Sequence, residues 1–227
     1  GVDLYLQATL CQTVLEGNRM RGAVVATPSG QGILYADCFV DATGDGTAAY
    51  LAGAECRVGR DSDGLAQPAT LAFTLCDVDE SRALAYYGGS DKVTLPDGKL
   101  KPYRELCREA NARGDLPKNV SIVKLHRTLY PGERNVNATQ ANGYNTLEAA
   151  QLGQAEMDLR GQIEQVTAFL RREVPGYARC RIALTPATLG VRESRRVMGD
   201  YVLADADVEN GARFDDVVVH QAWFVID

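Results

Sequence analysis

The chain has 227 residues, of which 45% are hydrophobic and 24% charged, a composition typical of globular proteins and not of disordered, collagen-like or coiled-coil chains. This length suffices for one large domain or two small ones. The 24 basic and 30 acidic side chains give a net charge of −6, which argues against a general surface for nucleic acid or anionic membranes. No apolar run approaches the roughly 18 residues needed to cross a bilayer, so no membrane span is predicted.

Cysteine and histidine usage points away from metal and disulfide chemistry. The six cysteines are scattered without a C-x-x-C pair, and the two histidines, His126 and His220, lie far apart. We therefore expect reduced, mostly buried thiols and no metal held by protein ligands. Such thiols favour a cytoplasmic location. Because the chain begins at Gly1 without an initiator methionine, we expect an excised part of a longer protein, whose own N-terminus and any signal peptide lie outside this sequence.

The first 54 residues are predicted to form a β-meander that leads into a helix. Apolar and β-branched runs between turn residues predict strands over residues 2–6, 8–15, 20–27 and 33–40. The last strand is expected to end in a buried stretch at residues 38–40. It continues into the turn Asp41-Ala42-Thr43-Gly44-Asp45-Gly46 and a small-residue helix over residues 47–54. This order is typical of sites that present free backbone N–H groups to an anion.

The rest of the sequence mixes strands with helices. Strands are predicted over residues 70–75, 120–129, 135–139, 179–184 and 196–202, and helices over 80–87, 102–113, 147–173 and 205–210. The longest helix starts with a capping-box-like pair, Asn145 and Glu148, and stops at Pro175-Gly176. Its apolar residues recur mostly three or four apart, so one face packs on a core. The fold class expected is α/β to α+β.

The turn at residues 41–46 is the sharpest local signal for function. Its glycines allow positive φ angles and close approach of a ligand to the backbone. Thr43 can donate a hydroxyl hydrogen bond, and Asp45 can accept one from a ribose-like or ribityl-like hydroxyl. A turn selected only for its backbone geometry has the same pattern, so both interpretations stay open at this point.

A second motif concentrates charge in a generally acidic chain. Its four charged residues within five positions are Arg192, Glu193, Arg195 and Arg196. Guanidinium groups bind carboxylates and phosphates, and an intervening glutamate can orient one of them, which suggests a site for an anionic substrate. The alternative is a structural Arg–Glu network that joins two elements. Nothing in the sequence supports hydrolase chemistry, and no catalytic residue is assigned.

Together these motifs resemble the bacterial FAD-dependent oxidoreductase family, flavoproteins with a glutathione-reductase-like FAD fold. The resemblance rests on FVDATGDG at residues 39–46, GLAQPATL at 64–71, GVRESRR at 190–196 and GDYVL at 199–203, which follow one another in the family's order. It spans nearly the whole chain. The R-E-S-R-R segment is the most distinctive of these matches.

The resemblance implies FAD as the cofactor and assigns roles to these residues. Ala42, Thr43, Gly44 and Asp45 would lie against FAD, and the strand near Leu10 would contact the adenine through its backbone. Residues 1–64 would complete the first half of the FAD domain with its β-meander. Residues 65–190 would form an inserted cap or substrate domain with an antiparallel sheet and helices. Residues 191–227 would form the boundary of the cap and the return to the FAD domain, with the arginine segment toward the isoalloxazine or the substrate.

One departure from the family concerns the phosphate-binding motif. No G-x-G-x-x-G follows a strand, so we expect a central fragment without the first βαβ unit, inactive and binding FAD weakly or not at all by itself. The full-length parent would be an FAD-dependent oxidoreductase acting on an unidentified, anionic small molecule. Dehydrogenase, reductase and monooxygenase chemistry all stay open. The alternative is a non-catalytic folded fragment that acts only as a binding or oligomerisation module.

Overall fold

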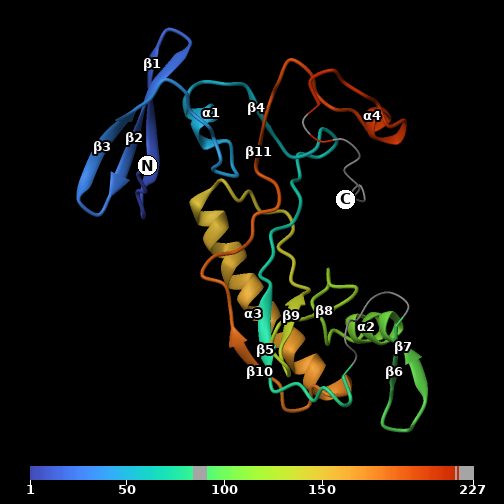
Figure 1. Cartoon of the computed structure of the whole chain (residues 1–227). Helices are drawn as coiled ribbons and strands as arrows, with labels where there is room; N and C mark the ends of the chain where they lie inside the picture. Colours follow the sequence, from blue (N-terminus) through green and yellow to red (C-terminus); the bar gives the residue numbers. More distant parts are fainter. Residues whose placement is uncertain (84–90, 218, 220–227) are drawn as a thin grey trace. The chain divides into compact units, whose positions relative to one another are not determined.

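The computed structural model describes residues 1–83, 91–217 and 219 (Figure 1). The chain divides into two compact units. Unit 1 comprises Gly1–Arg57 and Arg196–Asp227, and unit 2 comprises Val58–Arg195. Short strands β4 (Cys56–Val58) and β11 (Arg195–Val197) pair where the chain passes from one unit to the other. Among the described residues, no helix is long and apolar enough to cross a membrane.

Unit 1 contains the predicted β-meander. Strands β1 (Thr9–Glu16), β2 (Arg19–Thr27) and β3 (Gly30–Tyr35) pair antiparallel in chain order. Gly17, with φ of 58°, supplies the left-handed backbone needed in the tight turn between β1 and β2. Unit 1 also contains two short helices, α1 (Thr47–Leu51) and α4 (Asp205–Glu209).

Of the strands predicted in unit 1, the one over residues 2–6 is wrong and the one over residues 33–40 is right only in its first part. Residues 2–6 are irregular and exposed, and Gln7, with φ of 54°, turns the chain just before β1. Strand β3 ends at Tyr35, and residues 36–40 are irregular, with Val40 88% exposed. The apolar run at residues 38–40 suggested a buried strand, but no described strand pairs with it. The turn at residues 41–46 is therefore preceded by irregular chain.

Unit 2 is built on a four-stranded sheet in the order β10-β5-β9-β8. Its strands are β5 (Phe73–Cys76), β8 (Lys124–Arg127), β9 (Arg134–Asn137) and β10 (Arg181–Leu184). All three pairings are antiparallel, and β8 with β9 forms the predicted hairpin. A second hairpin, β6 (Lys92–Thr94) with β7 (Leu100–Pro102), was not predicted. Helices with antiparallel sheets place the fold on the α+β side of the expectation.

Two helices of unit 2 follow the prediction closely. Helix α2 (Tyr103–Ala112) begins after Pro102 and is followed by Gly114 with φ of 82°. Helix α3 (Ala149–Glu173) begins two residues later than predicted. The Asn145 side chain accepts a hydrogen bond from the N–H of Leu147 at 3.1 Å, in the turn just before that start. Of the helix predicted over residues 80–87, residues 80–83 form turns, and residues 84–87 lie outside the described residues.

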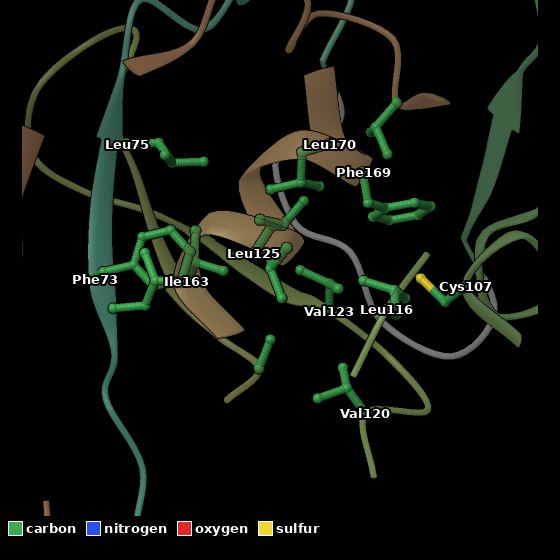
Figure 2. Packing of buried hydrophobic residues seen from close by; sticks show 14 of the residues in the cluster. Phe73, Leu75, Cys107, Leu116, Val120, Val123, Leu125, Ile163, Phe169 and Leu170 are labelled. Atoms are coloured by element: carbon green, nitrogen blue, oxygen red, sulfur yellow. The ribbon is translucent and has the colours of Figure 1, made fainter. Parts of the chain in front are cut away.

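The hydrophobic core lies between the sheet and the helices of unit 2 (Figure 2). In β5 the side chains alternate, so that Phe73 and Leu75 are buried while Thr74 and Cys76 are partly exposed. Helix α3 buries one stripe, confirming the three-to-four spacing read from the sequence; its buried members are Ala155, Leu159, Ile163, Val166, Thr167, Phe169 and Leu170. This core makes unit 2 a packed body.

The cysteines are all free, and only Cys107 and Cys180 are buried. The prediction of mostly buried thiols is therefore wrong, since Cys11 and Cys38 lie exposed in unit 1. No group of three or more His, Cys, Asp or Glu side chains in the described part of the chain could hold a metal ion.

A charged network joins the end of β5 to the β8–β9 hairpin. Arg134 is fully buried, and its guanidinium donates to both oxygens of Glu80, at 2.6 and 3.2 Å. Arg127 donates to the same carboxylate at 2.6 Å, and the backbone N–H of Gly132 does so at 2.9 Å. These three partners hold the pKa of Glu80 well below its usual value, Arg134 being the largest cause. A buried guanidinium requires such a partner, because an unpaired charge is costly to bury.

We predict that Glu80→Gln destabilises unit 2 and flattens its dependence on pH. The folded pKa of Glu80 lies below the unfolded value of 4.5, so its contribution is present above about pH 4.5 and is lost as the pH falls below it. Removing the charge leaves Arg134 without its anion and lowers the free energy of unfolding by about 2 kcal/mol at pH 7. Urea unfolding followed by circular dichroism at pH 3 to 7 measures both effects. Glu164→Gln, on the exposed face of α3, is the control; equal changes in the two variants would contradict the prediction.

Candidate functional site

The turn that precedes α1 is held together by its own side chains. Asp41 Oδ1 accepts hydrogen bonds from the Thr43 hydroxyl at 2.8 Å and the Thr43 N–H at 3.1 Å. Its other oxygen, Oδ2, accepts from the N–H of Ala49 in α1 at 3.0 Å. The Thr43 hydroxyl oxygen accepts in turn from the N–H of Thr47 at 2.9 Å. Asp41 and Thr43 together therefore cap the start of α1.

This arrangement corrects the expectation of free N–H groups at the helix start. The N–H groups of Thr47 and Ala49 already donate to Thr43 and Asp41, so an anion belonging to the chain occupies this position. Desolvation raises the pKa of Asp41, but hydrogen bonds from Ala49, Thr43 and Ala48 outweigh it and hold the pKa below its usual value. The start of α1 is consequently unsuited to a phosphate, because a second negative charge would be repelled.

The open side of the turn is its backbone at residues 42–44. Ala42, Thr43 and Gly44 are exposed, while Asp45 is half-buried. Gly44 has φ of 81° and open space where a Cβ would stand, so a ligand could approach its main chain closely. Gly46 differs, because a Cβ there would lie 3.0 Å from Cγ2 of Val197. Gly44 thus leaves the backbone of the turn open to a ligand, whereas Gly46 allows the end of the turn to pack against Val197.

Helix α1 is anchored to the meander through β1. The buried Thr13 donates its hydroxyl hydrogen bond to the carbonyl of Leu51, the last residue of α1, at 2.9 Å. Leu10 lies earlier on β1, paired with Val25, and the register shifts directly after it, between Leu10 and Gln12. A β-bulge of this kind redirects the backbone. Leu10 itself is half-buried.

The arginine segment is fixed by a contact from its glutamate to a distant loop. Glu193 Oε2 accepts from the backbone N–H of Gln67 at 2.9 Å, across 126 positions in sequence. Three residues earlier, Gly190 and Thr70 exchange two backbone hydrogen bonds, at 2.7 and 3.0 Å. Within unit 2 the structure therefore brings together GLAQPATL and GVRESRR, two of the segments that carry the resemblance.

The loop before Gln67 is closed by an ion pair. Arg60 donates to both oxygens of Asp63, at 2.8 and 2.7 Å, and Asp63 accepts from the N–H of Leu65 at 3.0 Å. The pair with Arg60, followed by the Leu65 N–H, lowers the pKa of Asp63 to about 2. Because Asp63 is exposed, this pair shapes the loop more than it stabilises the fold.

The exposure of the charged residues differs along the arginine segment. Arg192 and Arg196 are exposed, Glu193 and Arg195 are half-buried, and Ser194 is buried. Arg196 directly precedes Val197, whose side chain packs at Gly46 in unit 1. The N–H of Met198 donates to the carbonyl of Glu55 at 2.9 Å, which fixes the chain at this point. The C-terminal end of the arginine segment and the end of the turn thus lie close together in unit 1.

Comparison with known proteins identifies the family. A family model described as FAD dependent oxidoreductase matches residues 1–227. The chain belongs to this FAD-dependent oxidoreductase family. No curated protein and no solved structure matches the chain. Membership supports flavin redox chemistry and an FAD-binding fold, in agreement with the resemblance read from the sequence.

The residues of the turn fit part of an FAD site. An exposed main chain at Ala42, Thr43 and Gly44 suits an approach by the sugar or ring portions of the cofactor, and the carboxylate of Asp41 disfavours its diphosphate.

Two contacts were not predicted from the sequence: the hydrogen bonds that Asp41 accepts, and the hydrogen bond from the N–H of Gln67 to Glu193. An aspartate two residues before a threonine is typical of an Asx turn and could have indicated the contacts of Asp41 with Thr43. The hydrogen bond between Gln67 and Glu193 joins residues 126 positions apart and has no local signal.

We predict that Gly46→Ala destabilises unit 1 more than Gly17→Ala. The two glycines have φ of 59° and 58°, so the cost of a left-handed alanine, about 1 kcal/mol, is common to both. Only Gly46 adds a close contact with Val197, which must change rotamer at a further cost of about 1 kcal/mol. Hydrogen exchange of the meander amides measures the loss of stability in each of the two variants. Adding Val197→Ala should remove the difference; if it does not, the contact with Val197 is not its cause.

Proposed function

We propose that this chain supplies part of the FAD site of an oxidoreductase that acts on a small anionic molecule. Bound FAD supplies the redox chemistry, as the acceptor or donor of electrons. Ala42, Thr43, Gly44 and Asp45 orient it, with the backbone near Leu10 against the adenine. The observation that carries this proposal is the exposed, glycine-containing turn fixed on both sides, by Asp41 before it and by Val197 behind Gly46. A fixed turn binds a cofactor without a large loss of conformational entropy.

The proposal divides the chain into three functional parts. Residues 1–64 belong to the FAD domain, residues 65–190 to the cap over the substrate, and residues 191–227 to the boundary between them. We further propose that the whole enzyme extends beyond these residues and follows the glutathione-reductase-like plan, because a G-x-G-x-x-G unit for the cofactor diphosphate is not part of this sequence.

Arg192, Arg195 and Arg196 are proposed to bind the anionic group of the substrate. Glu193 supports them by holding the segment through the N–H of Gln67, at 2.9 Å. Guanidinium groups suit carboxylate and phosphate because they donate two parallel hydrogen bonds. Dehydrogenase, reductase and monooxygenase activities share these requirements.

An open hollow in unit 1 favours a second function as a binding or oligomerisation module. It has a volume of about 750 Å³ and is lined by residues 4–6, Val25, Thr27 and residues 28–34. Leu4, Leu6 and Ile33 in its lining are 76%, 73% and 45% exposed. Contiguous exposed apolar side chains mark surfaces that associate with other molecules. Association without cofactor binding would favour this function over the first.

We predict that FAD binding perturbs the turn. In a titration of the ¹⁵N-labelled chain with FAD, the amides of Ala42, Thr43, Gly44 and Asp45 should shift, with smaller changes near Leu10. NMR shifts report even millimolar affinities, so weak binding would still be detected. FMN and AMP serve as controls that separate the flavin from the adenine portion. FAD-induced shifts confined to unit 2, with the amides of the turn unchanged, would contradict the proposal.

We predict that Arg195→Ala raises the KM for the substrate or lowers kcat while the melting temperature stays within about 2 °C of the wild type. The reason is that a substrate-binding guanidinium is not needed for folding. Steady-state kinetics and thermal unfolding of the flavin-loaded enzyme give the two readouts. Arg19→Ala, an exposed arginine on β2, is the matched control. Unchanged kinetics with a clearly lower melting temperature would assign the arginine segment a structural role.

A further inference from the structure

The carboxylate of Asp41 lies where an anion bound at the start of α1 would lie. Its two oxygens accept hydrogen bonds from the hydroxyl and N–H of Thr43 and from the N–H of Ala49, all at 2.8 to 3.1 Å. Helix α1 has five residues, too few to be stable in water without such support. Asp41 thus connects the first part of the turn directly to the helix that follows it.

We propose that Asp41 is a positioning residue that holds the turn at residues 42–46 in the shape that receives FAD, without itself contacting the cofactor. This inference rests on the proposed function. Asp41 acts through Thr43: because Oδ1 accepts from both the hydroxyl and the N–H of Thr43, the side chain and the main chain of this residue are fixed together. The Thr43 hydroxyl then caps Thr47, so its orientation is set from both sides.

The same contacts determine which part of the cofactor the turn accepts. With the N–H groups of Thr47 and Ala49 already satisfied by the chain, no donor of these two residues is left for a phosphate. The negative charge of Asp41 also repels a phosphate. Asp41 therefore selects uncharged portions of the ligand, the sugar hydroxyls or the ring edge, at the exposed backbone of Ala42 and Gly44. Asp41→Asn should reduce this preference for uncharged groups over phosphate, since an amide carries no charge.

Asparagine is a sharp probe because it keeps the size of the side chain. Its single carbonyl oxygen can still accept from Thr43, but its NH₂ group then faces the N–H of Ala49, and two donors cannot pair. Hydrogen exchange of the chain without ligand should be about tenfold faster at Ala49, which loses its hydrogen bond to a charged acceptor, with a smaller increase at Thr43 and Thr47. Amides of the β1–β2 pair should change by less than about twofold.

The second readout is the binding of FAD, adenosine and AMP, each followed through the NMR shifts of the turn. For Asp41→Asn we expect an FAD dissociation constant about tenfold higher than in the wild type, with the preference for adenosine over AMP reduced. Asp41→Glu, which keeps the charge and displaces the carboxylate, should loosen the same amides to a smaller extent. Asp37→Asn is the matched control, because the backbone carbonyl of Asp37, and not its carboxylate, accepts from Arg19.

The outcomes separate the positioning role of Asp41 from the proposed FAD-binding function of the chain. Faster exchange confined to the turn, together with weaker FAD binding, supports the positioning role. Unchanged exchange in both Asp41 variants, equal acceleration across the meander, or a looser turn with unchanged affinity for FAD overturns it. If FAD shifts only amides of unit 2, the proposed function fails and the cofactor part of this inference fails with it. Exchange in the unliganded chain still decides whether Asp41 orders the turn.

Discussion

Two backbone hydrogen bonds between Thr70 and Gly190 close unit 2. They join residues 120 positions apart, and the chain between them forms the sheet, the long helix and all of the core except Ala69. Glu193 strengthens this closure by accepting from the N–H of Gln67. Closing so long a loop carries an entropic cost, which the buried core between β5 and α3 offsets. The arginine segment follows immediately, so its position depends on the same closure.

A comparable constraint organises the turn in unit 1, at a much shorter range. Asp41 and Thr43 satisfy the donors at the start of α1, and Thr13 satisfies a carbonyl at its end. The five-residue helix α1 is thereby held at both termini. The exposed backbone of residues 42–44 projects from a support that is fixed by side chains, and this combination of exposure and rigidity is what a cofactor contact requires.

Charge is used differently in the two units. In unit 2 the carboxylate of Glu80 makes it possible to bury Arg134 completely, and the pair ties the β8–β9 hairpin to the end of β5. In unit 1 the carboxylate of Asp41 replaces an external anion at a helix start. Both carboxyl groups have lowered pKa values because hydrogen bonds favour their ionised forms. The first interaction supports the core, and the second sets the chemistry of an exposed turn.

The sequence by itself determined the elements whose signals are local. The stop of α3 at Pro175-Gly176, the stripe of Leu159, Ile163 and Val166, and the turn at Gly17 all follow from residue type and spacing within a few positions. The motifs at residues 39–46 and 190–196 likewise indicated the flavoprotein family, which the match over the whole chain confirmed. The roles of Leu10, the residues of the turn and the arginines remain predictions.

Only the tertiary structure decided what depends on partners far along the chain. The apolar run at residues 38–40 resembled a buried strand but pairs with no strand among the described residues, and a strand forms only where its backbone groups find partners. The turn was expected to offer free N–H groups, yet the carboxylate of Asp41 accepts from Ala49, eight positions away, and the Thr43 hydroxyl accepts from Thr47. Glu193 bonds to Gln67, 126 positions away. Residue spacing describes a segment by itself, whereas hydrogen bonds between distant segments are selected by the folded chain as a whole.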